Sequence, residues 1–411
     1  MTSAVETTRP AISRSAGWTL TGAATLTMAV SYFDRQTFAA LGPIITEALS
    51  LTGRQYGLLG SAFSLAYLFG SPIAGRLVDR FGGRRVLLVA VLAWTLVAAL
   101  HSLVWSFASL FFLRILLGFT ESPSFPGATQ TVHRALPPAE RARGFGILFT
   151  GSSLGALVAP IAAGALSARY GFRVALLVTA IAGLVWVPMW LAATGAPERR
   201  AVLDKPAVHE VSPPMHAVLF HPAVLRTALL TLASAPVVSF VLLWGAKFLN
   251  HREGVVQADV GHYLWLPPLL FDLGAIAFGH AASKALGRRP EIPPLLFVVA
   301  GILASLMPIA LLVPGPWVMM VAGGVAVGGV AGLFAMFTAD MLSRVPASAV
   351  STAGGVTAAA QSLAYVVVNP LIGEAFDRSH SYDGSLLVLS ALVLPGVGIF
   401  LAWKPPPPRP H

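Results

Sequence analysis

The stretch Ser31-Tyr32-Phe33-Asp34-Arg35-Gln36-Thr37 places an acid and a base side by side inside a long apolar run. From residue 18 to residue 45, the only charged side chains are those of Asp34 and Arg35. The run is long enough to cross a bilayer as a helix. A charge at that depth costs roughly 2.5–3.5 kcal/mol on insertion scales, so such residues usually face a cavity or a partner. Either these two residues form a structural ion pair that fixes helix packing, or the chain provides them with a water-filled cavity and further partners.

The composition predicts an all-α membrane protein. Charged residues make up 11% of the 411 residues, against about 25% in soluble domains, and hydrophobic residues make up 56%. The net charge of +10 is spread over short loops between apolar runs, which is typical of membrane proteins and not of nucleic-acid binding. The chain has no cysteine, which excludes disulfides and thiolate metal sites.

The same residues give no sign of enzyme chemistry. The ten histidines form no cluster at metal-ligand spacing, and no nucleotide-binding motif or nucleophile–base arrangement stands out. We therefore expect no metal, no cofactor and no enzymatic activity.

Apolar runs and turn residues predict 12 transmembrane helices. We expect them near residues 17–47, 55–78, 85–104, 107–133, 140–168, 172–195, 223–250, 257–285, 292–313, 316–344, 349–376 and 383–403.

One long polar stretch, 196–222, contains five prolines and several charges and predicts a linker between two six-helix halves. The expected organisation is a tail at 1–16, a first bundle at 17–195, the linker, a second bundle at 223–403 and a tail at 404–411. The first apolar run is too long for a cleavable signal peptide, so none is expected.

The distribution of Lys and Arg predicts the orientation. With both termini on one side, the loops and tails of that side hold seventeen of these residues, and the other side holds five. The five are Arg54, Arg169, Arg173, Arg252 and Arg378. The positive-inside rule then places both termini and the linker in the cytoplasm.

The two halves resemble each other in the loop after their second span. Residues 75–85 read Gly-Arg-Leu-Val-Asp-Arg-Phe-Gly-Gly-Arg-Arg, and residues 279–289 end in a similar Gly-Arg-Arg. The first copy resembles the loop signature of the major facilitator superfamily, whose members consist of two pseudo-symmetric six-helix bundles and bind substrate between them. This resemblance implies that the loop joins neighbouring cytoplasmic helix ends. Its residues here are Gly75, Asp79, Arg80, Gly82, Arg84 and Arg85. The second copy has Ser283 in place of the acid.

A finer resemblance, to the anion:cation symporter branch, rests on two spans. Residues 32–36 read Tyr-Phe-Asp-Arg-Gln, and residues 114–126 read Arg-Ile-Leu-Leu-Gly-Phe-Thr-Glu-Ser-Pro-Ser-Phe-Pro. That branch includes bacterial hexuronate and aldonate transporters, sialin and vesicular glutamate carriers. The resemblance implies that Asp34 and Glu121 carry protons, that Arg35 binds the substrate carboxylate, and that Arg114 pairs with Glu121.

The spacing of Arg114 and Glu121 supports a related interpretation from the residues themselves. Seven residues are two helical turns, so both side chains point the same way. They form either a static pair within one helix or part of a cavity, and Pro123 and Pro126 just beyond favour a bent cavity helix.

Other polar residues in the spans complete the candidate site. Hydroxyls and amides suit a polyol such as a sugar acid. Besides the charged residues, the candidate substrate-binding residues are Tyr32, Gln36, Gln361, Asn369 and Lys247, with Thr150 and Ser152 as weaker candidates. Lys247 lies near a span end, so it either faces the cavity or extends to the membrane interface. Isolated Asp272 is open to either role, whereas Asp340 favours a structural one.

The chain is therefore expected to be a secondary transporter that moves a small organic anion, a sugar acid above all, together with protons, by alternating access. Burial disfavours an ionised carboxylate and a nearby guanidinium favours it, so protonation of an acid would release its arginine for substrate. The alternatives are transport of small mono- or dicarboxylates, sodium coupling, drug/proton antiport, or a non-transporting receptor. A monomer in the inner membrane is expected.

Overall fold

The computed structural model describes residues 12–204, 214–286, 288–289, 291–346 and 349–405, and the regular elements in these ranges are helices. Parts of both predicted tails (1–11 and 406–411) and the middle of the predicted linker (205–213) lie outside the described residues.

The first half of the chain forms helices α1 to α8, followed by the short helix α9. Their bounds are α1 Arg14–Ala40, α2 Gly42–Ala48, α3 Gly53–Phe81, α4 Gly83–Leu100, η1 His101–Leu103, α5 Phe107–Glu121, α6 Ser124–Ala135, α7 Pro138–Ala182, η2 Gly183–Val185, α8 Trp186–Thr194 and α9 Pro197–Leu203.

The second half begins with the short helix α10 and continues through α20. The bounds are α10 Met215–Leu219, α11 Pro222–Ser239, η3 Phe240–Trp244, α12 Gly245–Glu253, α13 Gly261–Leu264, α14 Leu266–Leu286, α15 Pro294–Ala304, α16 Ile309–Leu312, α17 Pro316–Leu342, α18 Val350–Ser379, α19 Asp383–Ala391 and α20 Val393–Ala402.

Nine helical segments in the described residues are long and apolar enough to cross a membrane. One of them, 143–194, has 52 residues, which is too long for a single span. It is interrupted at Gly171, whose φ of 80° and ψ of 162° are not helical. The long helix α1 and the α5–α6 pair lie outside these nine segments. The arrangement is thus consistent with the 12 predicted spans, although helix length and composition alone do not give that number.

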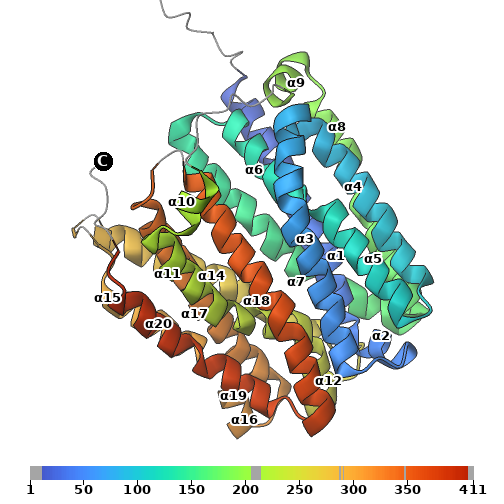
Figure 1. The fold of residues 1–411 in the computed structure, drawn as a ribbon. Coiled ribbons are helices and arrows are strands. Elements are labelled where there is room, and N and C mark those ends of the chain that lie inside the picture. The colour runs from blue at the N-terminus through green and yellow to red at the C-terminus, as the bar shows by residue number, and fades with distance from the viewer. Residues whose placement is uncertain (1–11, 205–213, 287, 290, 347–348, 406–411) are drawn as a thin grey trace, which may run out of the picture.

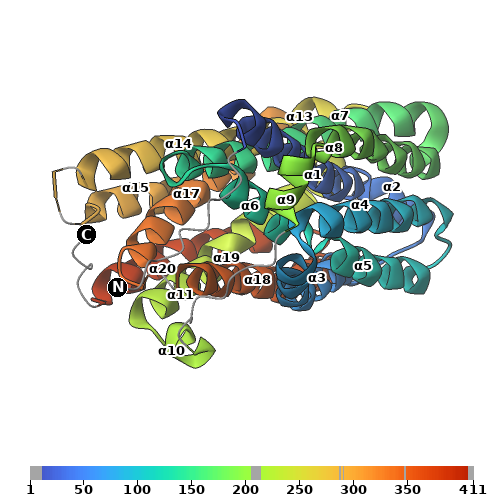
Figure 2. The ribbon, with the colours of Figure 1, turned by 90° about the horizontal axis from the view of Figure 1, so that it is seen from above.

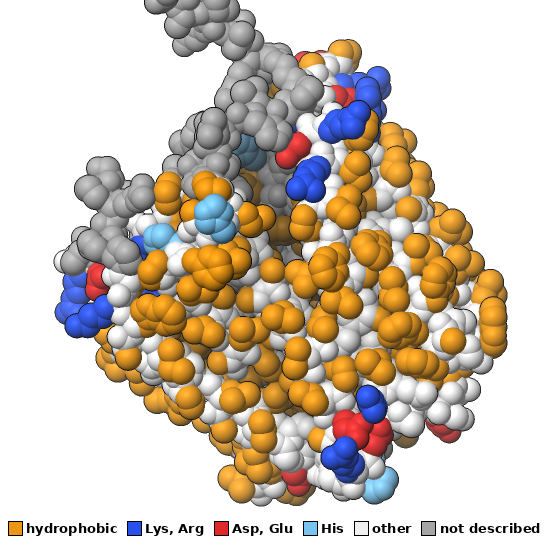
Figure 3. Space-filling view, viewed as in Figure 1, with side chains coloured by type: hydrophobic (Ala, Val, Ile, Leu, Met, Phe, Trp, Pro, Cys, Tyr) orange, Lys and Arg blue, Asp and Glu red, His pale blue; other side chains and the backbone are white. Residues whose placement is uncertain are grey.

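The two halves lie side by side as two helical bundles, seen in Figures 1 and 2. Helices α9 and α10, which flank the middle of the linker, lie at one end of the molecule, called here the linker end. Helices α2, α12 and α16 lie at the opposite end, called here the far end. The outer surface carries many exposed apolar side chains, as expected for contact with lipid (Figure 3); Phe69, Leu96 and Phe112 are each more than 60% exposed.

The halves contact each other mainly toward the far end, where α3 runs beside α18 (Figure 1). The hydroxyl of Ser61 donates a hydrogen bond to the carbonyl oxygen of Val366 at 2.8 Å. The hydroxyl of Tyr56 donates one to the carbonyl oxygen of Leu243 at 3.0 Å. In the described part of the chain, the hydrogen bonds between the halves lie at the far end or near mid-span, as for Ser153 and Asp272. Toward the linker end the surface between the halves is hollowed (Figure 3).

Glycines allow the closest helix contacts. A Cβ at Gly324, Gly328 or Gly332 of α17 would come within 2.4–2.7 Å of atoms of α14, so this glycine series lets the two helices pack closely.

Candidate functional site

Helix α1 carries the Asp34–Arg35 pair, and its packing determines where the two side chains point. Helix α7 approaches α1 through two glycines: a Cβ at Gly151 would lie 2.2 Å from the carbonyl oxygen of Thr25, and one at Gly155 would lie 2.1 Å from that of Ala29. Successive residues on a helix are about 100° apart. Asp34 and Arg35 therefore enter different surroundings.

The side chain of Arg35 forms an ion pair with Glu121 of α5. The Nε atom of Arg35 donates to Oε2 of Glu121 at 3.0 Å. The Glu121 side chain is fully buried and that of Arg35 is 19% exposed. Among the described residues, Nη2 of Arg35 and Oε1 of Glu121 have no hydrogen-bond partner. A single hydrogen bond thus joins the pair, and each member keeps further hydrogen-bonding capacity.

Three aromatic rings surround the guanidinium of Arg35. Its central carbon lies 5.0 Å from the ring centre of Tyr32, 4.8 Å from that of Phe63 and 4.7 Å from that of Tyr67. Aromatic faces stabilise a cation at these distances. The α3 rings reach this position because α3 and α5 pack closely: a Cβ at Gly118 would lie 2.4 Å from the carbonyl oxygen of Phe63.

Arg114 does not form the pair with Glu121 that the family resemblance implied. Its guanidinium carbon lies 4.1 Å from the ring centre of Phe38 and 4.9 Å from that of Phe63, and the residue is 4% exposed. Glu121 instead pairs with Arg35 of the neighbouring helix α1, which the spacing along α5 could not indicate. Of the two alternatives that the spacing left open, the static pair within one helix is therefore not formed.

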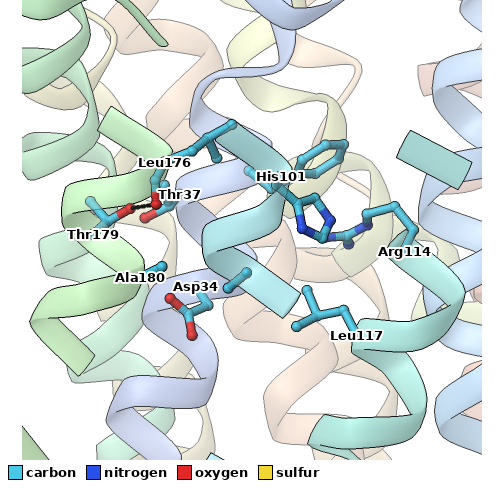
Figure 4. A pocket seen from close by; sticks show the side chains of 10 residues that line it. Asp34, Thr37, His101, Arg114, Leu117, Leu176, Thr179 and Ala180 are labelled. Atoms are coloured by element: carbon cyan, nitrogen blue, oxygen red, sulfur yellow. Dashed lines mark hydrogen bonds between the residues drawn. The ribbon is translucent and has the colours of Figure 1, made fainter. Parts of the chain in front are cut away.

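Asp34 faces a small cavity inside the first half (Figure 4). The cavity has a volume of about 20 Å³, which is enough for about one water molecule. His101 and Arg114 also line it. The three side chains come from α1, η1 and α5, and each residue is less than 10% exposed.

Several atoms around this cavity lack hydrogen-bond partners among the described residues, namely Oδ2 of Asp34, Nε2 of His101 and Nε of Arg114. The other ring nitrogen of His101, Nδ1, lies 2.8 Å from the carbonyl oxygen of Val97. A contact with a carbonyl requires a proton on Nδ1, which leaves Nε2 as an acceptor in the neutral ring. The lining of this cavity therefore offers both a hydrogen-bond donor and hydrogen-bond acceptors to a small polar molecule such as water.

The predicted polar lining is only partly assembled. Tyr32 and Gln36 are both half-buried and lie one turn apart on α1, so they share a side of that helix. In the other half, Nε2 of Gln361 donates to the hydroxyl of Tyr365 at 2.9 Å. The hydroxyl of Thr150 instead donates to the carbonyl of Ile147 at 2.7 Å, which is the backbone contact expected of membrane hydroxyls.

Asn369 and Lys247 are buried in the far-end contact and do not line an open cavity. Oδ1 of Asn369 accepts hydrogen bonds from Ser239 at 2.8 Å and from Nε1 of Trp244 at 3.1 Å. The ammonium of Lys247 donates to Thr46 at 3.0 Å. Lys247 is 8% exposed, so the alternative in which it extends to the membrane interface is wrong.

The isolated acids of the second half have partners. Oδ1 of Asp272 accepts from the hydroxyl of Ser153, on α7 of the other half, at 2.6 Å. Asp340 contacts both Arg226 and Arg344, in agreement with its predicted structural role.

The residues of the loop signature contact helix α6 of their own half and the start of the linker. Oδ1 of Asp79 accepts from Gln130 of α6 at 3.1 Å. Oδ2 of Asp204 lies 3.3 Å from Nη1 of Arg84 and 3.6 Å from Nε of Arg85. Gly82 has a φ of 83°, and a Cβ there would lie 2.7 Å from the backbone of residues 203 and 204. Gly75 has no neighbour within 4 Å of a built Cβ, and Arg80 is exposed beside Phe81.

Three residues near the charges were missed from the sequence: Phe63, Tyr67 and His101. Phe63 and Tyr67 are one turn apart, but an aromatic pair in an apolar helix is too common to indicate a site. His101 is the one histidine in the first 120 residues and lies at the end of an apolar run, which could have singled it out.

Comparison with known proteins agrees with this architecture. The chain matches the Major Facilitator Superfamily over residues 24–369. It is 25% identical over 376 residues to a hexuronate transporter of Bacillus subtilis, covering 89% of each chain. It is 24% identical to the hexuronate transporter of Escherichia coli K12, covering 88% of each chain.

The solved structures show the same fold. A bacterial homologue of the human lysosomal transporter Spinster, in an inward-facing and unoccupied conformation, superposes with a TM-score of 0.76 at 19% identity. The superposition covers 95% of this chain and 97% of that one. The length of the match and the shared fold lead to one conclusion: this chain belongs to the Major Facilitator Superfamily, and it is a multi-span membrane transporter and not an enzyme.

Proposed function

We propose that the protein is a proton-coupled symporter of an organic anion, most specifically a sugar acid such as a hexuronate or aldonate, working by alternating access. The observation that carries the proposal is the Arg35–Glu121 pair, held at one point and surrounded by aromatic rings. The relatives named as hexuronate transporters support the substrate class.

Arg35 is suited to bind the carboxylate of the substrate. A guanidinium recognises a carboxylate through two parallel N–H groups. Glu121 engages Nε of Arg35, and Nη2, which has no hydrogen-bond partner among the described residues, is available when substrate arrives. The rings of Tyr32 and Tyr67 keep the guanidinium in position and supply hydroxyl groups near it.

Glu121 is suited to couple proton binding to substrate binding. While it is ionised, it competes with the substrate carboxylate for Arg35. Protonation removes that competition, and the proton compensates the charge of the anion that enters. Asp34 is the second acid of this region, and we assign it the same coupling role from its burial beside the small cavity.

The proposed location is the inner membrane, with the termini and linker in the cytoplasm. The excess of Lys and Arg at the linker end supports this orientation. In that orientation, the closed far end and the hollowed linker end would correspond to an inward-facing state. Because the chain has no cysteine, single cysteines at Lys205 and Arg252 should react with an impermeant reagent from opposite sides of the membrane. Reaction of both from one side would contradict the topology.

Uptake by proteoliposomes tests the function directly. A panel of hexuronates, aldonates and small mono- and dicarboxylates is offered with an inward proton gradient, with an inward sodium gradient, and with neither. We expect accumulation of a sugar acid driven by the proton gradient and abolished by a protonophore. Accumulation driven by sodium alone would exclude proton coupling, and accumulation of only the small carboxylates would exclude the sugar-acid assignment.

A further inference from the structure

Asp377 lies near the end of α18 and connects the two halves at the far end. Its carboxylate contacts the first residues of α3, on the opposite half of the molecule. The backbone N–H of Gly53 donates to Oδ1 at 2.6 Å, and that of Arg54 donates to Oδ2 at 2.8 Å. Both carboxylate oxygens are therefore used by two consecutive backbone donors.

These two donors are groups that the helix cannot satisfy by itself. The first N–H groups of any helix have no partner within the helix. In α3 the side chain of Thr52 accepts only from the N–H of Gln55, in a capping box. Asp377 supplies the acceptors for the two donors that remain, and its negative charge lies at the positive end of the helix dipole. One half thus completes the N-terminal cap of a helix in the other half.

Two glycines make this approach possible. A Cβ at Gly53 would lie 2.7 Å from Oδ1 of Asp377 and 2.7 Å from the carbonyl oxygen of Gly373. A Cβ at Gly373 would lie 2.1 Å from the carbonyl oxygen of Gly53. Any side chain at either position would force α3 and α18 apart at the point where Asp377 binds.

The neighbouring charges do not provide an equivalent connection. Glu374 lies 3.6 Å from Arg54 across the halves and 2.7 Å from Arg378 within its own helix. The Arg54 side chain is 64% exposed, and exposed ion pairs contribute little. Asp377 is half-buried and makes two short bonds to backbone that cannot move away without moving the whole helix.

We propose that Asp377 is a positioning residue of the transport cycle, which caps α3 from the opposite half and so holds the far end closed. Opening of the far end requires this cap to be released. The inference rests on the proposed alternating access, but its test measures the distance between the halves and not transport, so the two proposals can fail separately.

The test uses spin labels on cysteines introduced at Leu103 and Leu312 of the full-length chain, which has no other cysteine. Leu103 belongs to the first half and Leu312 to the second, both at the far end, and they are 63% and 81% exposed. Distance distributions are measured by pulsed electron paramagnetic resonance in lipid nanodiscs, without substrate. Asp377→Ala should add a population at longer distance, with a roughly tenfold shift of the closed-to-open equilibrium, as expected for losing hydrogen bonds to a charged group.

Asp383→Ala is the matched control. Asp383 is another acid at the far end, but it forms an ion pair with Arg252 of its own half, at 2.5 Å. It should leave the distance distribution as in the parent. An unchanged distribution in Asp377→Ala, or an equal shift in Asp383→Ala, would overturn the proposal.

A second variant tests the contact from the other helix and keeps the proposal falsifiable if Asp377→Ala does not fold. Gly53→Ala leaves the carboxylate in place but inserts a methyl group between it and the helix, so it should shift the distribution in the same direction. Gly146→Ala is its control, because a Cβ there meets nothing within 4 Å. A closed distribution in folded Gly53→Ala protein would contradict the proposed role.

Discussion

Each half of the molecule contains a buried cluster of arginines and carboxylates, and the two clusters are built differently. In the second half, both oxygens of Asp340 are engaged, by Arg226 and by two nitrogens of Arg344. In the first half, Glu121 uses one oxygen toward Arg35, and Oε1 remains without a partner among the described residues.

The difference separates a structural role from a working one. A carboxylate whose acceptors are all engaged gains nothing from protonation, and its loss removes the shared acid partner of the arginines around it. A carboxylate that accepts a single hydrogen bond from its arginine can release that arginine to a substrate at small cost. Burial alone does not distinguish the two cases, since both acids are less than 10% exposed.

The largest expected effect concerns the acids of the first half. Asp34→Asn and Glu121→Gln each mimic the protonated acid, so proton-driven accumulation in proteoliposomes should be abolished, while substrate binding and counterflow of labelled for unlabelled substrate persist. Unfolding temperatures should stay near that of the parent. If both variants still accumulate substrate against its gradient, neither acid couples, and Asp272 becomes the next candidate.

A large loss of stability is expected in the second half. Asp340→Asn leaves Arg226 and Arg344 without their shared carboxylate, and removing one partner of a buried pair costs about 3–5 kcal/mol. Thermal unfolding of the purified protein should show a clear drop relative to Glu121→Gln. Equal unfolding temperatures for these two variants would remove the distinction between the clusters.

A moderate loss of affinity is expected for Arg35→Lys. The ammonium keeps the charge but cannot donate two parallel hydrogen bonds to a carboxylate, which corresponds to roughly tenfold weaker binding. Scintillation proximity or calorimetric titration with the transported acid measures it. Affinity equal to the parent in both Arg35→Lys and Arg35→Ala would show that the substrate carboxylate binds elsewhere.

The smallest effect is expected at the edge of the second cluster. Glu291 pairs with Arg344 at 2.9 Å, but its side chain is 59% exposed. Exposed pairs contribute about 0–1 kcal/mol, so Glu291→Gln should change the unfolding temperature little. A loss as large as that of Asp340→Asn would mean that the whole cluster, and not Asp340, carries the stability.

The sequence predicted the class of fold and the main charged residues, because a charge in an apolar run is costly and therefore conspicuous. Asp34, Arg35, Arg114 and Glu121 all lie within the buried region of the first half. What the sequence could not predict was the pairing among them, which depends on how α1 and α5 approach each other.

Residues whose role depends on contacts between the halves were the hardest to interpret. Asn369 and Lys247 were expected at a substrate cavity, yet they bind Trp244 and Thr46 inside the far-end contact. The contact of Asp377 could not be predicted, because nothing local in the sequence pairs it with a residue more than 300 positions away. Such pairings arise only when two bundles meet.

The length of the first arm of α7, from Pro138 to the break at Gly171, has a consequence for the bilayer around the protein. At 1.5 Å per residue this arm is roughly 50 Å long, whereas the hydrocarbon layer is about 30 Å thick. Even with tilt, its first turns must extend into the headgroup layer. There Glu140 accepts from the indole of Trp18 at 2.8 Å, and the guanidinium of Arg143 lies 5.3 Å from the same ring. Bilayer thickness and the supply of anionic headgroups should therefore determine how deeply this end of the transporter sits.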